Sequence, residues 1–316
     1  MKRTIASTAF FLTLAFTGFA QQEPLVSHYM FNHLLINPAY AGSKDFAMVS
    51  LLYRTQWTGL DGAPKSVLGS INGPVFKSRK VGLGLTLSND KIGVTNSTDI
   101  YGDYAYHIPL SDKFKLGLGA KAGISYISEG VPDKLIDDND PLYQADRSKI
   151  VPNLGAGAYL HSRTFYFGVS SPRLITYDPD RPAAVGDTAS ETPAIVRHYW
   201  VTSGAAFEVS PDFVIRPSIM LRASKNVPLQ ADINANFLIK QFLWLGATFR
   251  TGDEHAGMPE AVIGLVELQL TKQFRVGYSY DFTMSELSDY SGGSHEISLG
   301  YDFGRDVLKM KSPRYF

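Results

Sequence analysis

Residues 113–128, KFKLGLGAKAGISYIS, alternate between two kinds of side chain. From Phe114 to Tyr126 every even position is apolar, whereas the odd positions up to Ser125 carry lysine, glycine or serine. Successive side chains of a β-strand point to opposite faces, so such a strand has one apolar and one polar face. Soluble strands usually have about five or six residues. The greater length and the alternation together predict a tilted strand that crosses a bilayer, with lipid on one side and water on the other.

The same alternation recurs along most of the chain. In 81–88, valine and leucine alternate with glycine, threonine and serine, and in 273–282 phenylalanine, valine and tyrosine alternate with polar residues and glycine. This pattern predicts an all-β chain of about fourteen strands. The predicted strands are 45–56, 65–74, 80–89, 97–108, 113–128, 152–161, 163–171, 196–209, 212–222, 229–240, 242–251, 259–270, 273–283 and 294–304.

The connections between these strands alternate in length. One set is tight and the other is longer, and in outer-membrane barrels the short turns are periplasmic while the long loops are extracellular. An open sheet edge in lipid would leave backbone groups without hydrogen bonds. We therefore predict a closed, transmembrane, antiparallel up-and-down β-barrel with both chain ends on the periplasmic side. The tight connections lie near 77–79, 110–112, 162, 210–211, 241 and 271–272, and the longer ones near 57–64, 90–96, 129–151, 172–195, 223–228, 252–258 and 284–293.

The composition agrees with strands that face lipid on one side and water on the other. The mean hydropathy is −0.07, which is too polar for a bundle of membrane helices. The 30 basic and 30 acidic residues cancel, so no net charge attracts the chain to nucleic acid. The chain has no cysteine, which excludes disulfides, thiolate metal sites and a thiol nucleophile. A soluble two-sheet structure or propeller is an alternative, but its strands would be shorter.

The first 20 residues have the features of a secretory signal peptide. Lys2 and Arg3 precede a short apolar run at 10–16, and small residues stand before the expected cleavage between Ala20 and Gln21. The apolar run is too short to span a membrane as a helix. We expect the mature protein to reside in the outer membrane.

The mature chain divides into three predicted parts. Residues 21–43 lack strand alternation and form a periplasmic N-terminal segment or a plug in the lumen. A short helix in this segment would stop near Asn37-Pro38, because a residue before proline avoids the helical region. Residues 44–304 form the barrel, and 305–316 form a periplasmic C-terminal tail.

No motif in the chain predicts catalysis or a cofactor. Gly82-Leu83-Gly84 is an incomplete dinucleotide fingerprint, and the acidic run at 137–140 lacks the ligand spacing of a calcium loop. His295 and Glu296 would point to opposite faces of a strand. A hydrolase with a serine and a histidine in the barrel wall is the enzyme alternative, but no spacing pairs the two. We expect a non-enzymatic protein without bound metal or cofactor.

Several charged residues lie on the predicted inner faces of the strands, so the lumen is expected to be wet. They either pair with one another across the lumen or hold a plug or a protein segment there. These residues are Arg54, Lys121, Arg216, Asp232, Arg250, Arg275, Asp281 and Asp302.

Sequence blocks along nearly all of the mature chain resemble the PorP/SprF family of Bacteroidota outer-membrane proteins, which is associated with type IX secretion and gliding motility. These blocks include 24–32, 37–42, 53–57, 89–93 and 277–282. Family members usually have glutamine where this chain has His28. The resemblance implies a non-enzymatic barrel that helps to export or anchor type IX cargo such as adhesins. It implies three partners: the C-terminal region of the cargo, type IX machinery on the periplasmic side, and outer-membrane lipid.

The family-like blocks near the N-terminus supply our candidates for partner binding. A structural role is an equal alternative, because an Asn-Pro turn and a luminal arginine also constrain folding. Two other functions stay open: a passive or fatty-acid-type channel, which needs an open lumen, and an outer-membrane lipase or deacylase. The candidate partner-binding residues are Asn37, Pro38, Ala39, Tyr40, Gly42, Arg54, Gln56 and Trp57.

Overall fold

The computed structural model describes residues 26–130, 147–176, 196–225, 227–252 and 259–304. Within these ranges the chain consists of β-strands and short 3-10 turns. No helix of the described part has both the length and the apolar character needed to cross a membrane.

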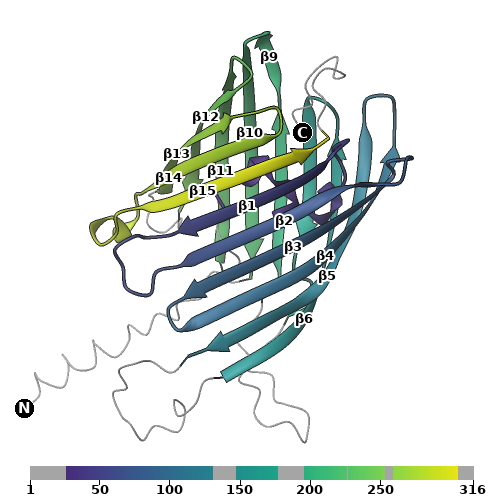
Figure 1. The fold of residues 1–316 in the computed structure, drawn as a ribbon. Coiled ribbons are helices and arrows are strands. Elements are labelled where there is room, and N and C mark those ends of the chain that lie inside the picture. Colours follow the sequence, from purple (N-terminus) through teal and green to yellow (C-terminus); the bar gives the residue numbers. More distant parts are fainter. Residues whose placement is uncertain (1–25, 131–146, 177–195, 226, 253–258, 305–316) are drawn as a thin grey trace, which may run out of the picture.

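The strands form a closed antiparallel barrel of fourteen strands with one additional short strand (Figure 1). Strands that follow one another in sequence pair, except that β8 pairs with β10 and not with β9; because β1 pairs with β15 and β10 with β11, the ring has no open edge. The predicted closed up-and-down barrel is confirmed. The strands are β1 Ala47–Thr55, β2 Lys65–Val75, β3 Val81–Ile92, β4 Thr95–Pro109, β5 Lys115–Glu129, β6 Arg147–His161, β7 Phe165–Ser171, β8 His198–Ala205, β9 Phe207–Ser210, β10 Phe213–Ser224, β11 Val227–Ile239, β12 Leu243–Thr251, β13 Pro259–Gln269, β14 Phe274–Thr283 and β15 Ser294–Phe303.

The additional strand arises from a single interruption. Both β8 and β9 pair with β10, and only Ala206 separates them. Together they occupy the place of the one strand predicted at 196–209. The other strand boundaries lie within a few residues of the predicted ones; the largest difference is at β6, which begins at Arg147 rather than at residue 152.

Two of the connections predicted to be long are tight turns. Only Gly93 and Val94 separate β3 from β4, and only residues 225 and 226 separate β10 from β11. The ladder continues to the pair Ile92 and Thr95, and Gly93 has a φ of +57° that suits a two-residue hairpin. The prediction was wrong because polar residues on both faces ended the apolar alternation while the hydrogen-bonded pairing continued.

The two ends of the barrel differ, and we call them the turn end and the loop end. The turn end carries the β2–β3, β4–β5, β6–β7, β9–β10, β11–β12 and β13–β14 connections, together with the start of β1 and the end of β15. The loop end carries the remaining connections, including 56–64 and 284–293. Every turn-end connection in this set is at most five residues long.

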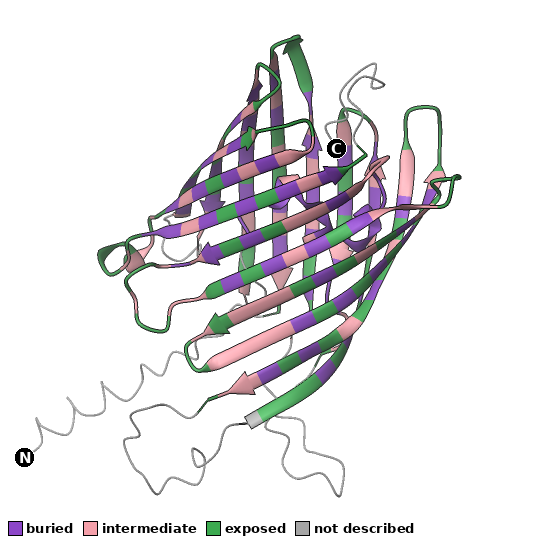
Figure 2. Ribbon diagram, in the orientation of Figure 1, coloured by how far each residue is buried: buried purple, intermediate pink, exposed green. Residues whose placement is uncertain are grey.

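Buried and exposed residues alternate along the strands (Figure 2). The outward faces are apolar; on β3, for example, Leu83, Leu85 and Leu87 are each more than 40% exposed. The inward faces carry the buried polar and charged residues. An apolar belt around a closed ring is the surface that a bilayer requires, because lipid cannot hydrogen-bond to polar groups.

Candidate functional site in the barrel lumen

Residues 26–43 lie inside the barrel, where nearly all of them are buried. They form three short 3-10 turns, η1 Tyr29–Phe31, η2 His33–Leu35 and η3 Pro38–Tyr40, which are drawn in purple within the ring of strands (Figure 1). We call residues 26–43 the luminal segment. Two alternatives were open for residues 21–43, a periplasmic segment and a plug in the lumen, and the burial of residues 26–43 against the barrel wall agrees with the second. Residues 21–25 lie outside the described part of the chain.

The local sequence explains the last of these turns. The side-chain Oδ1 of Asn37 accepts a hydrogen bond of 3.0 Å from the backbone N–H of Ala39, and Pro38 follows at the first position of η3. Asparagine is a favoured N-cap, and proline is favoured at the first position because it needs no hydrogen-bond partner there. The Asn37-Pro38 pair therefore starts a turn instead of only ending one.

The luminal segment runs along the barrel from the loop end to the turn end. Near its start, Ser27 and His28 contact Glu296 close to the beginning of β15. At its other end, the carbonyl of Ala41 lies 2.8 Å from Nε2 of His107, near the end of β4. The start of β15 belongs to the loop end and the end of β4 to the turn end. The segment therefore fills the length of the lumen instead of covering one mouth.

Glycines on the inner faces of β3, β5 and β6 leave room for this segment. A Cβ atom at Gly82 would overlap the carbonyl of Ala41, one at Gly119 would overlap the backbone of Ala39, and one at Gly157 would overlap the Asn37 side chain. A side chain at any of these positions would push the luminal segment away from the wall. The glycines of Gly82-Leu83-Gly84 are thus wall residues facing the segment, not part of a nucleotide site.

Ionic contacts hold the loop-end part of the segment. Arg54 on β1 lies 2.7 Å from Asp281 on β14 and 3.3 Å from Glu296 on β15. The same two carboxylates bind the segment: Nδ1 of His28 is 2.6 Å from Glu296, the backbone N–H of Ser27 donates to Glu296 at 2.9 Å, and the Ser27 hydroxyl donates to Asp281 at 3.0 Å. Hydrogen bonds to charged groups are stronger than neutral ones, and burial removes competing water.

The ionic contacts continue around the wall. Arg250 on β12 is 3.5 Å from Asp281 and 3.0 Å from Asp232 on β11, and Arg222 on β10 is 3.0 Å from Asp232. Six charged residues thus form one connected set, the luminal network: Arg54, Arg222, Asp232, Arg250, Asp281 and Glu296. Three are acidic and three are basic, so the buried charges compensate one another, as burial requires.

Aromatic rings surround the middle of the segment. The guanidinium of Arg216 lies 4.9 Å from the ring centre of Trp244 and 5.7 Å from that of Phe31, and it donates to the carbonyl of Met30 at 3.2 Å. A cation over an aromatic face is attracted by the ring quadrupole. Arg216 therefore ties η1 to the wall through a cation–aromatic contact and a hydrogen bond.

The remaining predicted luminal charges also point inward. Arg275 pairs with Asp302 at 3.2 Å, and Lys121 lies over the Tyr101 ring with its Nζ 4.6 Å from the ring centre. All three are at least nine-tenths buried. The lumen therefore contains paired charges, cation–aromatic contacts and an apolar segment within one compact interior.

The candidate partner-binding residues do not share one surface. Asn37, Pro38, Ala39, Tyr40 and Gly42 are buried in the lumen toward the turn end. Arg54 belongs to the luminal network, and Gln56 and Trp57 begin the β1–β2 connection at the loop end. There the backbone N–H of Trp57 donates to the Ser294 hydroxyl at 3.1 Å.

Sequence reasoning did not select Ser27, His28 and Glu296 as site residues. The alternation did place Glu296 on the inner face of its strand, so a signal was present for that residue. For Ser27 and His28 there was none, since the two lie in a segment without periodicity and contact residues on the opposite end of the chain.

Metal and acyl chemistry each need a particular arrangement of side chains, with which the luminal groups of the described residues can be compared. Within the described residues, no three His, Asp or Glu side chains are grouped as metal ligands. His28 and Glu296 resemble two members of a hydrolase triad, but Nε2 of His28 has no hydrogen-bond partner in the described part of the chain. A nucleophilic serine should lie within hydrogen-bond reach of that nitrogen.

The chain is similar in fold to several solved structures. Omp33 of Acinetobacter baumannii is 8% identical with a TM-score of 0.45, and the similarity covers 82% of this chain and 100% of that one. A KdgM porin in complex with disordered oligogalacturonate is 8% identical with a TM-score of 0.39, covering 81% and 99%. OmpF of Salmonella typhi in complex with daunomycin is 10% identical with a TM-score of 0.37, covering 81% and 97%.

Comparison of sequences identifies the family. No functionally curated relative matches the chain. Residues 18–301 match the family described as type IX secretion system membrane protein PorP/SprF. This match spans the luminal segment and almost the whole barrel, and it agrees with the apolar belt in placing the protein in the outer membrane. The chain belongs to the PorP/SprF family of type IX secretion system membrane proteins.

Proposed function

We propose that this barrel is a cargo-specific accessory or anchor protein of type IX secretion, which acts by binding and not by catalysis. Family membership supports a place in the secretion apparatus. In this proposal the loop end holds the C-terminal region of a secreted surface protein such as an adhesin. The turn end contacts secretion machinery in the periplasm, and the apolar belt contacts outer-membrane lipid.

The filled lumen is the observation that carries the proposal. A passive or fatty-acid-type channel needs a continuous open path, whereas residues 26–43 occupy the lumen from one end to the other. Their contacts include ionic hydrogen bonds with Glu296 and close backbone approach at Gly119. Because this segment occupies the lumen, the proposal places partner binding at the loop end and the turn end of the barrel.

Trp57 is the candidate residue best placed to meet cargo. It lies in the 56–64 connection at the loop end and is only partly buried, whereas the neighbouring Gln56 is buried. A partner would reach Asn37 or Tyr40 only if the luminal segment left the barrel, because both residues are buried. We therefore assign those two a structural role and reserve cargo contact for the loop end.

Deletion of the gene, followed by mass spectrometry of surface and secreted proteins, tests the proposal. We expect one or a few surface proteins to disappear from the cell surface, and restoration of the gene to return them. Affinity purification of the barrel from solubilised outer membranes should recover the same cargo or a type IX component.

Two further measurements separate the alternatives. Steady ion conductance of the unmodified barrel in planar bilayers, with an unchanged surface proteome in the deletion strain, would favour a channel. Hydrolysis of ester substrates by the purified barrel, abolished by His28→Ala, would favour a lipase or deacylase.

A further inference from the structure

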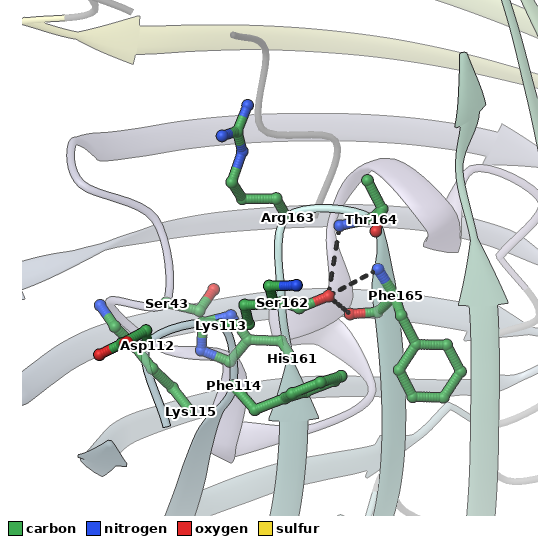
Figure 3. Close-up of a pocket in the computed structure, with 10 residues that line it drawn as sticks. All are labelled: Ser43, Asp112, Lys113, Phe114, Lys115, His161, Ser162, Arg163, Thr164 and Phe165. Atoms are coloured by element: carbon green, nitrogen blue, oxygen red, sulfur yellow. Dashed lines mark hydrogen bonds between the residues drawn. The ribbon is translucent and has the colours of Figure 1, made fainter. Parts of the chain in front are cut away.

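A pocket of about 540 Å³ lies at the turn end of the barrel. It is formed by residues 112–115 of the β4–β5 turn and residues 161–165 of the β6–β7 turn, and Ser43 at the end of the luminal segment also lines it (Figure 3). Pockets that bind ligands usually measure about 300–1,000 Å³. The pocket therefore has room for several side chains of a bound peptide.

The pocket carries an excess of positive charge. Lys113, Lys115 and Arg163 line it, with Asp112 as the single carboxylate. Within the described residues, none of these three cations forms an ion pair. By contrast, Arg79 on the neighbouring β2–β3 turn pairs with Asp45 at 3.1 Å. Unpaired cations in a concave site attract anionic groups.

Hydroxyl groups hold both turns in place. The Ser111 hydroxyl accepts hydrogen bonds from the backbone N–H groups of Lys113 at 3.3 Å and Phe114 at 3.1 Å. In the second turn, the Ser162 hydroxyl accepts from Thr164 at 3.3 Å and from Phe165 at 3.0 Å (Figure 3). The backbones that carry the cations are thus ordered before a ligand arrives, which reduces the entropy lost on binding.

The pocket belongs to the inner side of the wall. Lys115 and Gly117 share one face of β5, and Gly117 faces the carbonyl of Ala39 in the luminal segment. His161, the last residue of β6, is buried. Lipid headgroups lie outside the wall, so this position favours a ligand that arrives from the aqueous space at the barrel mouth.

We propose that this pocket binds an acidic segment of a periplasmic protein, whose carboxylates pair with Lys113, Lys115 and Arg163. The proposal rests on the proposed function, in which the turn end faces the secretion machinery. Because Ser43 lines the pocket, the bound segment also touches the end of the luminal segment.

The test measures binding of a fluorescein-labelled oligoglutamate peptide to the full mature barrel in neutral detergent micelles, by fluorescence anisotropy. The variant Lys113→Glu/Arg163→Glu removes two pocket cations. The control Lys240→Glu/Lys272→Glu makes the same change in charge on the β11–β12 and β13–β14 turns, across the barrel at the same end. Heat-modified migration on gels checks that each variant is folded.

We expect the pocket variant to weaken peptide binding by about tenfold and the control by less than about twofold, because three cations line one pocket whereas Lys240 and Lys272 lie on separate turns. Equal losses in both variants would overturn the proposal, since bulk charge would then explain binding. So would binding of oligolysine as strong as that of oligoglutamate, or complete displacement of the peptide by phosphatidylglycerol. A negative result would refute peptide binding at this pocket. It would not refute the role in secretion, which the gene deletion tests in cells.

Discussion

Nδ1 of His28 lies 2.6 Å from Oε1 of Glu296, and both side chains are buried in the lumen. The contact joins residues 268 positions apart and fastens the luminal segment to β15. Glu296 also accepts from the backbone N–H of Ser27 and pairs with Arg54. One carboxylate thus binds the segment and the wall together.

Glu296→Gln should destabilise the barrel. The substitution keeps the shape but removes the charge that His28, Ser27 and Arg54 share, and hydrogen bonds to charged groups contribute about 1.5–3 kcal/mol each. We expect a loss of about that size in the free energy of unfolding, measured by urea denaturation in lipid vesicles. Glu286→Gln, at an exposed position of the 284–293 connection, is the control. An equal effect in both variants would show that the Glu296 contacts do not stabilise the fold.

Gly119→Ala should move the luminal segment. The added Cβ would overlap the backbone of Ala39, and the strand cannot yield without breaking its ladder. Overpacking of this kind costs about 1–3 kcal/mol. We expect higher ion conductance in planar bilayers than for the unmodified barrel, together with lower stability. Gly264→Ala is the control, because no atom lies within 4 Å of the Cβ it adds. If the two variants conduct equally, the segment does not block the lumen.

Leu85→Arg should be costly in the membrane. Leu85 is 41% exposed in the middle portion of β3 on the outer face, and an arginine at the bilayer midplane costs about 2–4 kcal/mol. Val94→Arg introduces the same side chain in the β3–β4 turn at the loop end, where the cost should be about 0–1 kcal/mol. Unfolding in vesicles measures both. Similar costs at the two positions would contradict a bilayer belt around Leu85.

Epitope tags should report opposite sides of the membrane. A tag after Asp289, in the 284–293 connection, should be detected by antibody on intact cells. A tag after Arg163, in the β6–β7 turn, should be detected only after the outer membrane is permeabilised. Expression of both proteins is checked in lysed cells. The reverse pattern would show that the barrel has the opposite orientation in the membrane. The acidic-peptide pocket would then lie at the cell surface.

Local repetition made the strands predictable. On a strand the side chains alternate every two residues, so the apolar outer face of 113–128 or 81–88 is visible without knowledge of any partner strand. Four turn-end connections also share a readable pattern, Ser or Thr followed three residues later by Phe, at Ser111, Ser162, Ser210 and Thr271. In three of these connections the backbone N–H of the phenylalanine donates a hydrogen bond to the hydroxyl oxygen. The pairs are Phe114 with Ser111, Phe165 with Ser162 and Phe274 with Thr271.

The extent of the strands beyond the bilayer was less visible. At 88–91 both faces are polar, so the apolar signal ended before the hydrogen-bonded ladder did. Alternation reports the solvent on each face, and it disappears once both faces meet water.

By itself, the amino-acid sequence determined the class of fold, the number of strands to a close approximation and the side of the wall on which each strand residue lies. Only the tertiary structure decided that residues 26–43 enter the lumen, which glycines face them, and that Arg54 meets Asp281 and Glu296. The physical reason is range: alternation arises between neighbouring residues, whereas these contacts exist only after ring closure brings β1 beside β15.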